Sequence, residues 1–225
     1  MICDNVKRVF DKMEKAASLS GRSLDDITLV GVTKTVTAKE ARELMDAGVK
    51  NLGENRVQSL LDKYDVLKDE PVWHLIGHLQ TNKVKYIADK VSMIHSVDSV
   101  KLAEEIDRRC APLGKVMDIL IEINSGEENK DGIEPSEAFS VIEEVSKLKN
   151  VRIKGLMTMA PIYAPEETLK KVFSDLYKLS VDISSKRYDN VSMECLSMGM
   201  SGDYEEAVRQ GATIIRPGRT LFNTK

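Results

Sequence analysis

A lysine stands in this chain where an apolar run ends and a helix start begins. The segment LVGVTKTVTAKEA, residues 29–41, places Lys34 two positions after Val32 and four after Val30. Residues two apart on a strand point to the same face, so Lys34 shares a face with both valines. An amine held above an apolar interior loses solvation and becomes a nucleophile toward aldehydes. The alternative interpretation is a solvated lysine at a strand end, paired with an acid.

Two loops late in the chain have the composition of phosphate-binding turns. LSMGMSGDYEEA contains Ser201 and Gly202 just before a helix start at Asp203, and IIRPGRTLF contains Gly218 followed by Arg219. Small residues let backbone N–H groups approach an anion, and a helix N-terminus adds a favourable potential. One serine-glycine turn is ordinary, but two such loops, together with the lysine, indicate a phosphorylated aldehyde as ligand.

The arginine that precedes the second loop, Arg216, has two interpretations. It could form a structural ion pair inside the fold, or it could face the ring nitrogen of a bound pyridine. Because arginine stays charged, the second arrangement would keep that nitrogen unprotonated and make the ring a poor electron sink.

The pattern of the chain predicts a closed barrel that positions these residues. Short β-rich runs alternate with amphipathic helical stretches from Ile27 onward, which indicates a parallel sheet. Eight runs in 225 residues favour an α/β fold of the single (β/α)8 TIM barrel type. An open doubly wound sheet is less favoured, because no G-x-G-x-x-G turn follows the first run. The runs are 27–34, 50–55, 72–78, 91–98, 116–124, 151–159, 191–198 and 212–218.

In such a barrel the chemistry lies at the carboxyl ends of the strands, and phosphate commonly binds after strands seven and eight. Lys34 is predicted to be the last residue of the first strand, and Arg216 to lie on the eighth. The two glycine-containing loops follow the seventh and eighth runs. One domain over residues 1–225 is expected, because no linker or change of composition divides the chain.

Apolar spacing also predicts an N-terminal helix, within residues 1–22, that packs on the barrel. Its apolar face contains Ile2, Val6, Val9, Phe10 and Met13. Further helix starts are predicted from N-terminal signals. These signals are the capping box Thr37 to Glu40, Asp98, Pro165 in a first turn, and Asp203 to Glu206.

Composition excludes several classes of function. The chain is 42% hydrophobic and 31% charged, with a net charge of -3, so its overall charge recruits neither nucleic acid nor an anionic membrane. No apolar run reaches membrane-spanning length and no secretory signal opens the chain, which predicts a cytoplasmic protein. Cys3, Cys110 and Cys195 have no metal or redox spacing and are expected to be free thiols.

No metal site is predicted. His74 and His78 are four apart on a strand rather than on a helix, and His95 lies on another strand, so all three are interpreted as core or surface residues. Charged residues on neighbouring strands predict interior ion pairs rather than a glycosidase carboxylate pair. These residues are Asp118 and Glu122 on the fifth strand, and Arg152 and Lys154 on the sixth.

Seven segments, in order, resemble the pyridoxal phosphate homeostasis proteins, whose fold is similar to the N-terminal barrel domain of alanine racemase. The match runs from about residue 27 to the end of the chain. The segments are VGVTKT, LGENRVQ, WHLIGHLQTNK, INSGEENKDG, GLMTMAP, LSMGMSGDYEEAV and IRPGRTLF.

The resemblance implies pyridoxal 5'-phosphate as cofactor and gives roles to individual positions. Lys34 would be the Schiff-base lysine, and Arg216 would face the pyridine nitrogen. Asn55 would lie beside the cofactor. The phosphate would be surrounded by Met198, Ser201, Gly218 and Arg219.

The chain departs from the family pattern at the second loop. Where the family often has an apolar residue, a glycine and a small hydroxyl residue, this chain has Pro217, Gly218 and Arg219. The hydroxyl contact is lost, and the Arg219 N–H, its guanidinium or Thr220 would have to replace it. Asn223 stands in place of a family glycine, which bears only on the end of the chain.

The function expected from the resemblance is a monomeric carrier that holds pyridoxal phosphate on Lys34 for cofactor homeostasis, without turnover and without catalytic residues. A racemase needs a second acid or base on the opposite cofactor face, and the sequence ends soon after its eighth run. Two alternatives stay open. One is an enzyme, either a slow amino-acid racemase or a class I aldolase that uses Lys34. The other is an interaction module that serves pyridoxal phosphate-dependent apoenzymes by direct transfer.

Overall fold

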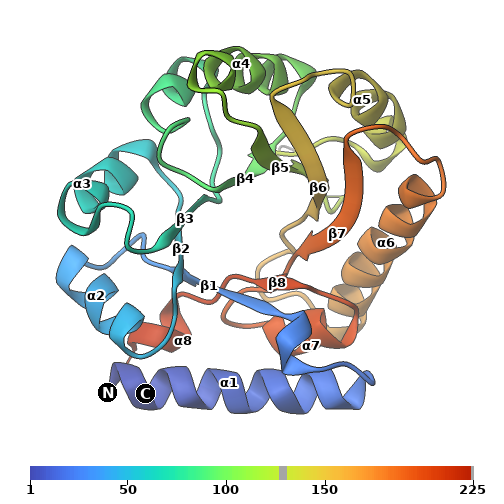
Figure 1. Cartoon of the computed structure of the whole chain (residues 1–225). Coiled ribbons are helices and arrows are strands. Elements are labelled where there is room, and N and C mark those ends of the chain that lie inside the picture. Colours follow the sequence, from blue (N-terminus) through green and yellow to red (C-terminus); the bar gives the residue numbers. More distant parts are fainter. Residues whose placement is uncertain (127–130, 224–225) are drawn as a thin grey trace.

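Eight parallel strands close into a barrel, as the alternating pattern predicts. The structure is a computed structural model, and it describes residues 1–126 and 131–223. The strands follow one another around the barrel in chain order, and the first pairs with the last (Figure 1). They are β1 (Thr28–Val32), β2 (Asn51–Glu54), β3 (Val72–Leu75), β4 (Met93–Val97), β5 (Met117–Glu122), β6 (Val151–Met157), β7 (Val191–Ser197) and β8 (Ile214–Ile215).

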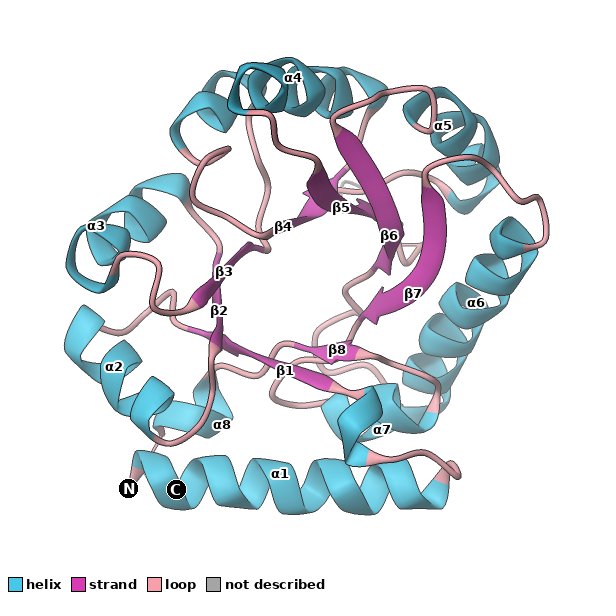
Figure 2. Ribbon diagram, in the orientation of Figure 1, coloured by secondary structure: helices cyan, strands magenta, loops and turns pink. Residues whose placement is uncertain are grey.

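Helices surround the barrel on its outer side (Figure 2). A short 3-10 segment, Thr81–Tyr86, takes the place of a helix between β3 and β4. No helix in the described part of the chain is long and apolar enough to cross a membrane. The helices are α1 (Ile2–Leu19), α2 (Ala38–Asp46), α3 (Val57–Leu67), α4 (Val100–Cys110), α5 (Ala138–Val145), α6 (Glu166–Ser184), α7 (Tyr204–Arg209) and α8 (Arg219–Phe222).

The strands bury apolar side chains on both faces, as strands of a parallel barrel must. The outward-facing residues form the main core with the surrounding helices. A smaller cluster fills the barrel interior, and its buried members are Val30, Leu120, Met157 and Ile214. Val30 therefore points inward as predicted, and alternation along β1 directs Val32 the same way.

Helix α1 confirms the predicted N-terminal helix, although it ends at Leu19. It lies across α7 and α8 on the outside of the barrel (Figure 1). Val6, Val9 and Met13 are buried on its inner face as predicted. Asn5 is also buried there, which the apolar spacing did not predict.

Two strand ends differ from the predictions. β1 ends at Val32, so Lys34 lies two residues beyond the strand, in a turn. β8 ends at Ile215, so Arg216 lies immediately after it. Pro217 has no N–H to continue the ladder, although its carbonyl accepts from the Val32 N–H at 2.9 Å. Both residues thus belong to the rim of the barrel rather than to its strands.

The predicted helix starts are confirmed in part. Thr37 and Glu40 form the capping box of α2. Ser99, rather than Asp98, caps α4, because its hydroxyl accepts from the Leu102 N–H. Asp203 precedes α7, but its carboxylate accepts from the Met200 N–H inside the preceding loop instead of capping the helix.

One of the predicted ion pairs between neighbouring strands is present, but it does not lie in the interior, because the Arg152 side chain is exposed. Arg152 pairs with Asp118 of the neighbouring strand at 2.7 Å. Lys154 instead pairs with Glu194 on β7, so the pairing of Lys154 with a fifth-strand acid is wrong. The described cysteines are free thiols, as predicted.

A glycine allows β6 and β7 to approach each other. Gly155 has φ +156°, and a Cβ placed on it would lie 1.8 Å from the carbonyl oxygen of Cys195. The neighbour is backbone on the paired strand, so neither side can move without breaking the ladder.

We expect Gly155→Ala to lower the free energy of unfolding by about 3 kcal/mol or more, because the methyl group forces β6 away from β7. Gly21→Ala is the matched control, since Gly21 also has a positive φ, +68°, but open space around its Cβ position. The control should lose only about 1 kcal/mol. Urea denaturation of both variants measures the difference, and equal losses would show that backbone strain alone is responsible.

Candidate functional site

The residues singled out in the sequence lie mostly at one end of the barrel. Lys34 follows β1, Asn55 follows β2, Ser201 lies in the loop after β7, and Gly218 precedes α8. The carboxyl ends of parallel strands meet at one rim, so these loops share the same mouth. Closure of the barrel places the first and last of them side by side, since a Cβ on Gly218 would lie 3.2 Å from the Val32 carbonyl oxygen.

The turn that carries Lys34 is held from below by a buried ion pair. The Thr33 hydroxyl donates to Glu54 Oε1 at 2.5 Å, and Lys63 Nζ lies 2.8 Å from the same oxygen. Lys34 itself is exposed, so the expectation of an amine desolvated above the interior is wrong. Its backbone is thus fixed while its side chain stays free to meet a ligand.

The Thr33, Glu54 and Lys63 cluster was missed by the sequence analysis. A signal was present, because Lys63 lies between Leu60 and Leu67 on the apolar stripe of α3. A lysine at a core position usually means a buried acid nearby, and Glu54 is fully buried.

Asn55 presents an uncompensated polar atom. Its Oδ1 is buried and has no hydrogen-bond donor among the described residues. Gly77 packs directly against the Asn55 backbone, where a Cβ would lie 2.4 Å from the carbonyl oxygen. A buried acceptor without a donor is costly to the protein alone, and a ligand that donates a hydrogen bond would remove that cost.

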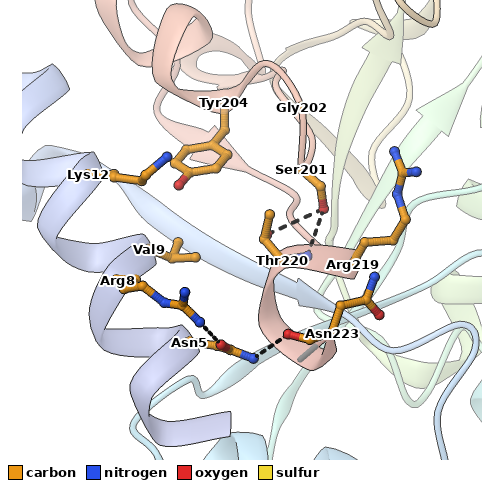
Figure 3. Close-up of a pocket in the computed structure, with 10 residues that line it drawn as sticks. All are labelled: Asn5, Arg8, Val9, Lys12, Ser201, Gly202, Tyr204, Arg219, Thr220 and Asn223. Carbon is orange, nitrogen blue, oxygen red and sulfur yellow. Dashed lines mark hydrogen bonds between the residues drawn. The ribbon is translucent and has the colours of Figure 1, made fainter. Parts of the chain in front are cut away.

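The two glycine-containing loops converge on one hydroxyl group. Ser201 Oγ accepts hydrogen bonds from the Gly218 N–H at 3.0 Å and the Thr220 N–H at 3.3 Å. Thr220 Oγ1 lies 3.4 Å from the same atom (Figure 3). Two backbone donors and two hydroxyls thus meet at the start of α8, which is an arrangement suited to an oxyanion.

A cavity of about 390 Å³ adjoins this point, between α1 and the two loops (Figure 3). Among the described residues that line it, Arg8, Lys12 and Arg219 are cationic and none is acidic. Lys12 is paired with Glu205 at 2.7 Å, just outside the lining. The surroundings of the converging loops therefore favour negative charge.

Met198 does not reach the rim. Its side chain is fully buried in the main apolar core, and its N–H donates to the Ile214 carbonyl at 3.1 Å. Neither group is available to a phosphate, so Met198 shapes the loop from below and the predicted contact is not supported by the geometry.

Arg216 is only 3% exposed and lies inside the barrel mouth. Its Nη1 donates to Ser197 Oγ at 2.5 Å and its Nη2 to the Thr158 carbonyl at 2.9 Å. Burial lowers the pKa of the guanidinium to about 10, with Glu122 and Asp203 opposing the shift, so it stays charged at neutral pH. These bonds use two of its five N–H groups.

A chain of hydrogen bonds runs from Arg216 across the barrel interior. Ser197 Oγ lies 2.8 Å from His95 Nδ1, and His95 Nε2 lies 2.9 Å from His74 Nδ1. His74 Nε2 lies 3.1 Å from Asn51 Oδ1. Arginine only donates and the Asn51 oxygen only accepts, so we assign the protons to Ser197 Oγ, His95 Nε2 and His74 Nε2. Every link then points away from Arg216.

This assignment requires both imidazoles to be neutral. Burial lowers the pKa of His74 to about 4. Burial, together with the charges of His74 and Arg216, lowers the pKa of His95 well below its usual value. The interpretation of His74 and His95 as core residues is confirmed, but their direct contact was not foreseen.

Glu122 adds a titratable group to the mouth. It is buried at the end of β5, and burial raises its pKa to about 7, with Arg216 opposing the shift and Asp131 and Asp98 adding to it. From its place in the sequence, Glu122 was expected to form an interior ion pair with a neighbouring strand. Its charge is balanced instead by the field of Arg216, which lies across the barrel.

His78 lies outside this network, in an exposed group with two acids. Its Nδ1 is 3.3 Å from Asp98 Oδ2 and 3.6 Å from Asp131 Oδ1. All three offer metal-type ligand atoms within 4.8 Å of one another. Exposed acidic groups of this kind also occur without a metal, and the sequence analysis gave His78 no role.

Comparison with known proteins agrees with this geometry. The family model for the alanine racemase N-terminal domain matches residues 12–225. The pyridoxal phosphate homeostasis protein of Aquifex aeolicus (strain VF5) is 43% identical over 99% of this chain and 98% of its own length. The protein of the same name from Escherichia coli (strain K12) is 35% identical over 100% of this chain and 97% of its own.

The chain belongs to the pyridoxal phosphate homeostasis protein family.

Solved structures agree with this membership. PipY of Synechococcus elongatus PCC7942, solved with pyridoxal phosphate bound, is 31% identical, with a TM-score of 0.85 over 99% of this chain and 100% of its own. A protein of Bifidobacterium adolescentis described as unknown is 34% identical, with a TM-score of 0.93 over 98% of this chain and 94% of its own. Alanine racemase of Clostridium difficile 630 shares the fold, with a TM-score of 0.78 and 18% identity, over 99% of this chain and 57% of its own.

Within this homeostasis-family barrel, we expect the buried imidazoles to make stability fall in acid. The unfolded chain binds protons on His74 and His95 below about pH 6.5, whereas the folded chain excludes them, so stability is full above that pH and is lost toward about pH 4. His74→Gln should reduce the loss between pH 8 and pH 5 by about 2 kcal/mol. His78→Gln is the matched control, because its ring is exposed. Urea denaturation at both pH values measures the effect, and identical losses in both variants would contradict neutral buried rings.

Proposed function

We propose that this chain binds pyridoxal 5'-phosphate at the barrel mouth, through Lys34, and contributes to the intracellular homeostasis of the cofactor. The observation that carries the proposal is the meeting of the Gly218 and Thr220 N–H groups at Ser201 Oγ, on the same rim as Lys34. The names of the relatives and the ligand of the PipY structure support the same ligand here.

The residues present fit the chemical groups of this cofactor. The Lys34 amine would attack the aldehyde carbon, forming a C=N bond while the carbonyl oxygen leaves as water. Ser201, Gly218 and the Arg219 and Thr220 backbone would hold the phosphate. The buried Asn55 Oδ1, which has no donor among the described residues, would accept from a ring hydroxyl.

The pyridine nitrogen of the cofactor would face Arg216. This placement supports a binding role for the chain, without catalytic turnover. The bound cofactor supplies an electrophilic aldehyde and a conjugated ring that acts as an electron sink only when its nitrogen is protonated. The Arg216 guanidinium is charged and donates to two protein oxygens, Ser197 Oγ and the Thr158 carbonyl, which hold it in place. Arg216, as a charged donor, would keep the ring nitrogen unprotonated, so carbanion chemistry would be disfavoured.

The departure at position 219 is accommodated by backbone and by Thr220. The Arg219 side chain is exposed, whereas the Thr220 N–H and hydroxyl both lie near Ser201 Oγ. We propose that Thr220 supplies the hydroxyl contact and that Arg219 adds only long-range positive charge.

The decisive experiment is reductive trapping. We expect the purified chain with pyridoxal phosphate to absorb in the visible range, and borohydride to leave a pyridoxyl group on Lys34. Lys34→Ala should lose both signals, whereas Lys39→Ala, an exposed lysine of the next helix, should keep them. Peptide mass mapping identifies the labelled residue.

A protein that stays colourless, or a Lys34→Ala variant that labels fully elsewhere, would contradict the assignment. Trapping with a sugar phosphate but not with pyridoxal phosphate would favour a class I aldolase. Exchange of the α-hydrogen of alanine for solvent deuterium would favour a racemase and overturn the role without turnover.

We further propose that the chain works in the cytoplasm as a monomer and passes its cofactor directly to apoenzymes. The exposure of Lys34 supports direct transfer, because a partner could reach a cofactor held on this residue without unfolding the carrier. We expect the transfer rate to rise with the concentration of an added pyridoxal phosphate-dependent apoenzyme. Stopped-flow absorbance measures it, and a rate equal to spontaneous release at every concentration would contradict direct transfer.

A further inference from the structure

We propose that Asn5 of α1 is a positioning residue for the cofactor phosphate, which makes the site select phosphorylated over unphosphorylated forms of the cofactor. The inference rests on the proposed function. Asn5 touches no ligand group itself and acts by fixing α8, whose first residues carry the phosphate donors.

The Asn5 side chain bridges α1 to the end of α8. Asn5 is 2% exposed, and its Nδ2 donates to the Leu221 carbonyl at 3.1 Å. The same Nδ2 donates to the Asn223 carbonyl at 3.0 Å (Figure 3). Arg8, one turn further along α1, donates to Asn5 Oδ1. Both ends of the carboxamide are therefore held, so its orientation is fixed.

Helix α8 depends on such outside support. It has only four residues, Arg219–Phe222, which is too short to hold its shape alone. The cavity of about 390 Å³ lies along one side of it and removes packing there. Leu221 anchors it by apolar burial, and the Asn5 carboxamide satisfies carbonyls at its C-terminal end.

The C-terminal end of α8, which Asn5 holds, lies about one helical turn from the N-terminal end, which carries the proposed phosphate donors. At the first end, Gly218 and Thr220 direct their N–H groups toward Ser201 Oγ. A tilt of so short a helix at the Asn5 end moves these donors by a similar amount. Charge-assisted hydrogen bonds to phosphate weaken steeply with such displacements.

The sequence context makes a polar residue at this position informative. The neighbours of Asn5 on the inner face of α1, Val6, Val9 and Met13, are apolar. Burying a carboxamide costs free energy unless it forms hydrogen bonds. The Asn5 carboxamide donates its hydrogen bonds to α8 and the residue after it, rather than to the barrel strands. If Asn5 served only packing, its replacement would change the stability of the fold alone. If it positions α8, its replacement would also lower the affinity for a phosphorylated ligand.

The test compares affinities for pyridoxal phosphate and for pyridoxal, measured by absorbance titration. Asn5→Ala should weaken pyridoxal phosphate binding about tenfold and change pyridoxal binding less than about twofold. Asn5→Leu, which keeps the volume while removing all three hydrogen bonds, should have the same effect, and it guards against a failure of Asn5→Ala to fold. Ser201→Ala provides the benchmark for loss of a phosphate contact.

Met13→Ala is the matched control, because Met13 is fully buried in α1 about two turns beyond Asn5, toward α7. It should destabilise the fold while keeping the ratio of the two affinities. An unchanged ratio in folded Asn5→Ala or Asn5→Leu would overturn the inference and leave the proposed function intact. A wild-type chain that binds neither compound would overturn the proposed function, and the inference would fall with it.

Discussion

The pairing of the first strand with the last is the contact on which this molecule depends. Thr28 and Leu29 pair with Ile214 and Ile215, and the Val32 N–H donates to the Pro217 carbonyl. This short ladder closes the barrel and leaves no free sheet edge. It also brings the turn of Lys34 next to the segment of Gly218, so that an amine and the N–H groups that meet at Ser201, from distant parts of the sequence, share one rim.

Closure also creates an interior that must hold charge. Arg216 is buried there, and a buried cation is tolerated only when its donors are used and opposite charge is near. Ser197 and Thr158 accept from it, and Glu122 and Asp203 supply the field. The neutral imidazoles extend this arrangement to the far side of the barrel. The groups that surround or extend from the Arg216 guanidinium thus come from β2 to β7 or from the ends of these strands.

Much of the fold could be predicted from local patterns, because they report local physics. Alternation in β1 identified its inward face, and Thr37 with Glu40 marked the start of α2. The order of runs predicted the barrel, and the loops around Ser201 and Gly218 were correctly expected to meet. The predicted ends of the strands were less accurate, because a strand ends where it loses its hydrogen-bonding partner. At β8 this happens near Pro217, which has no N–H to donate.

The features that were missed are pairings across long sequence distances. His74 and His95 look unremarkable singly, and only the pairing of β3 with β4 brings them together. Asn5 appears as an interruption of an apolar stripe until its partners, more than 200 residues later, are known. Met198 is the opposite case, since a motif resemblance placed this residue around the phosphate, whereas its side chain packs in the core.

The bridge between α1 and α8 has a consequence for the order of events during synthesis. The hydrogen bond from Asn5 to Leu221 joins positions separated by 216 residues, so α1 can complete its contacts only after the segment of α8 has been synthesised. Until that segment emerges, the inner face of α1 lacks part of its cover, and the Gly218 and Thr220 N–H groups have not met Ser201 Oγ. A nascent chain therefore exposes Lys34 long before the segment of Gly218 and Thr220 can join it, and this rim of the barrel is assembled only when synthesis has passed α8.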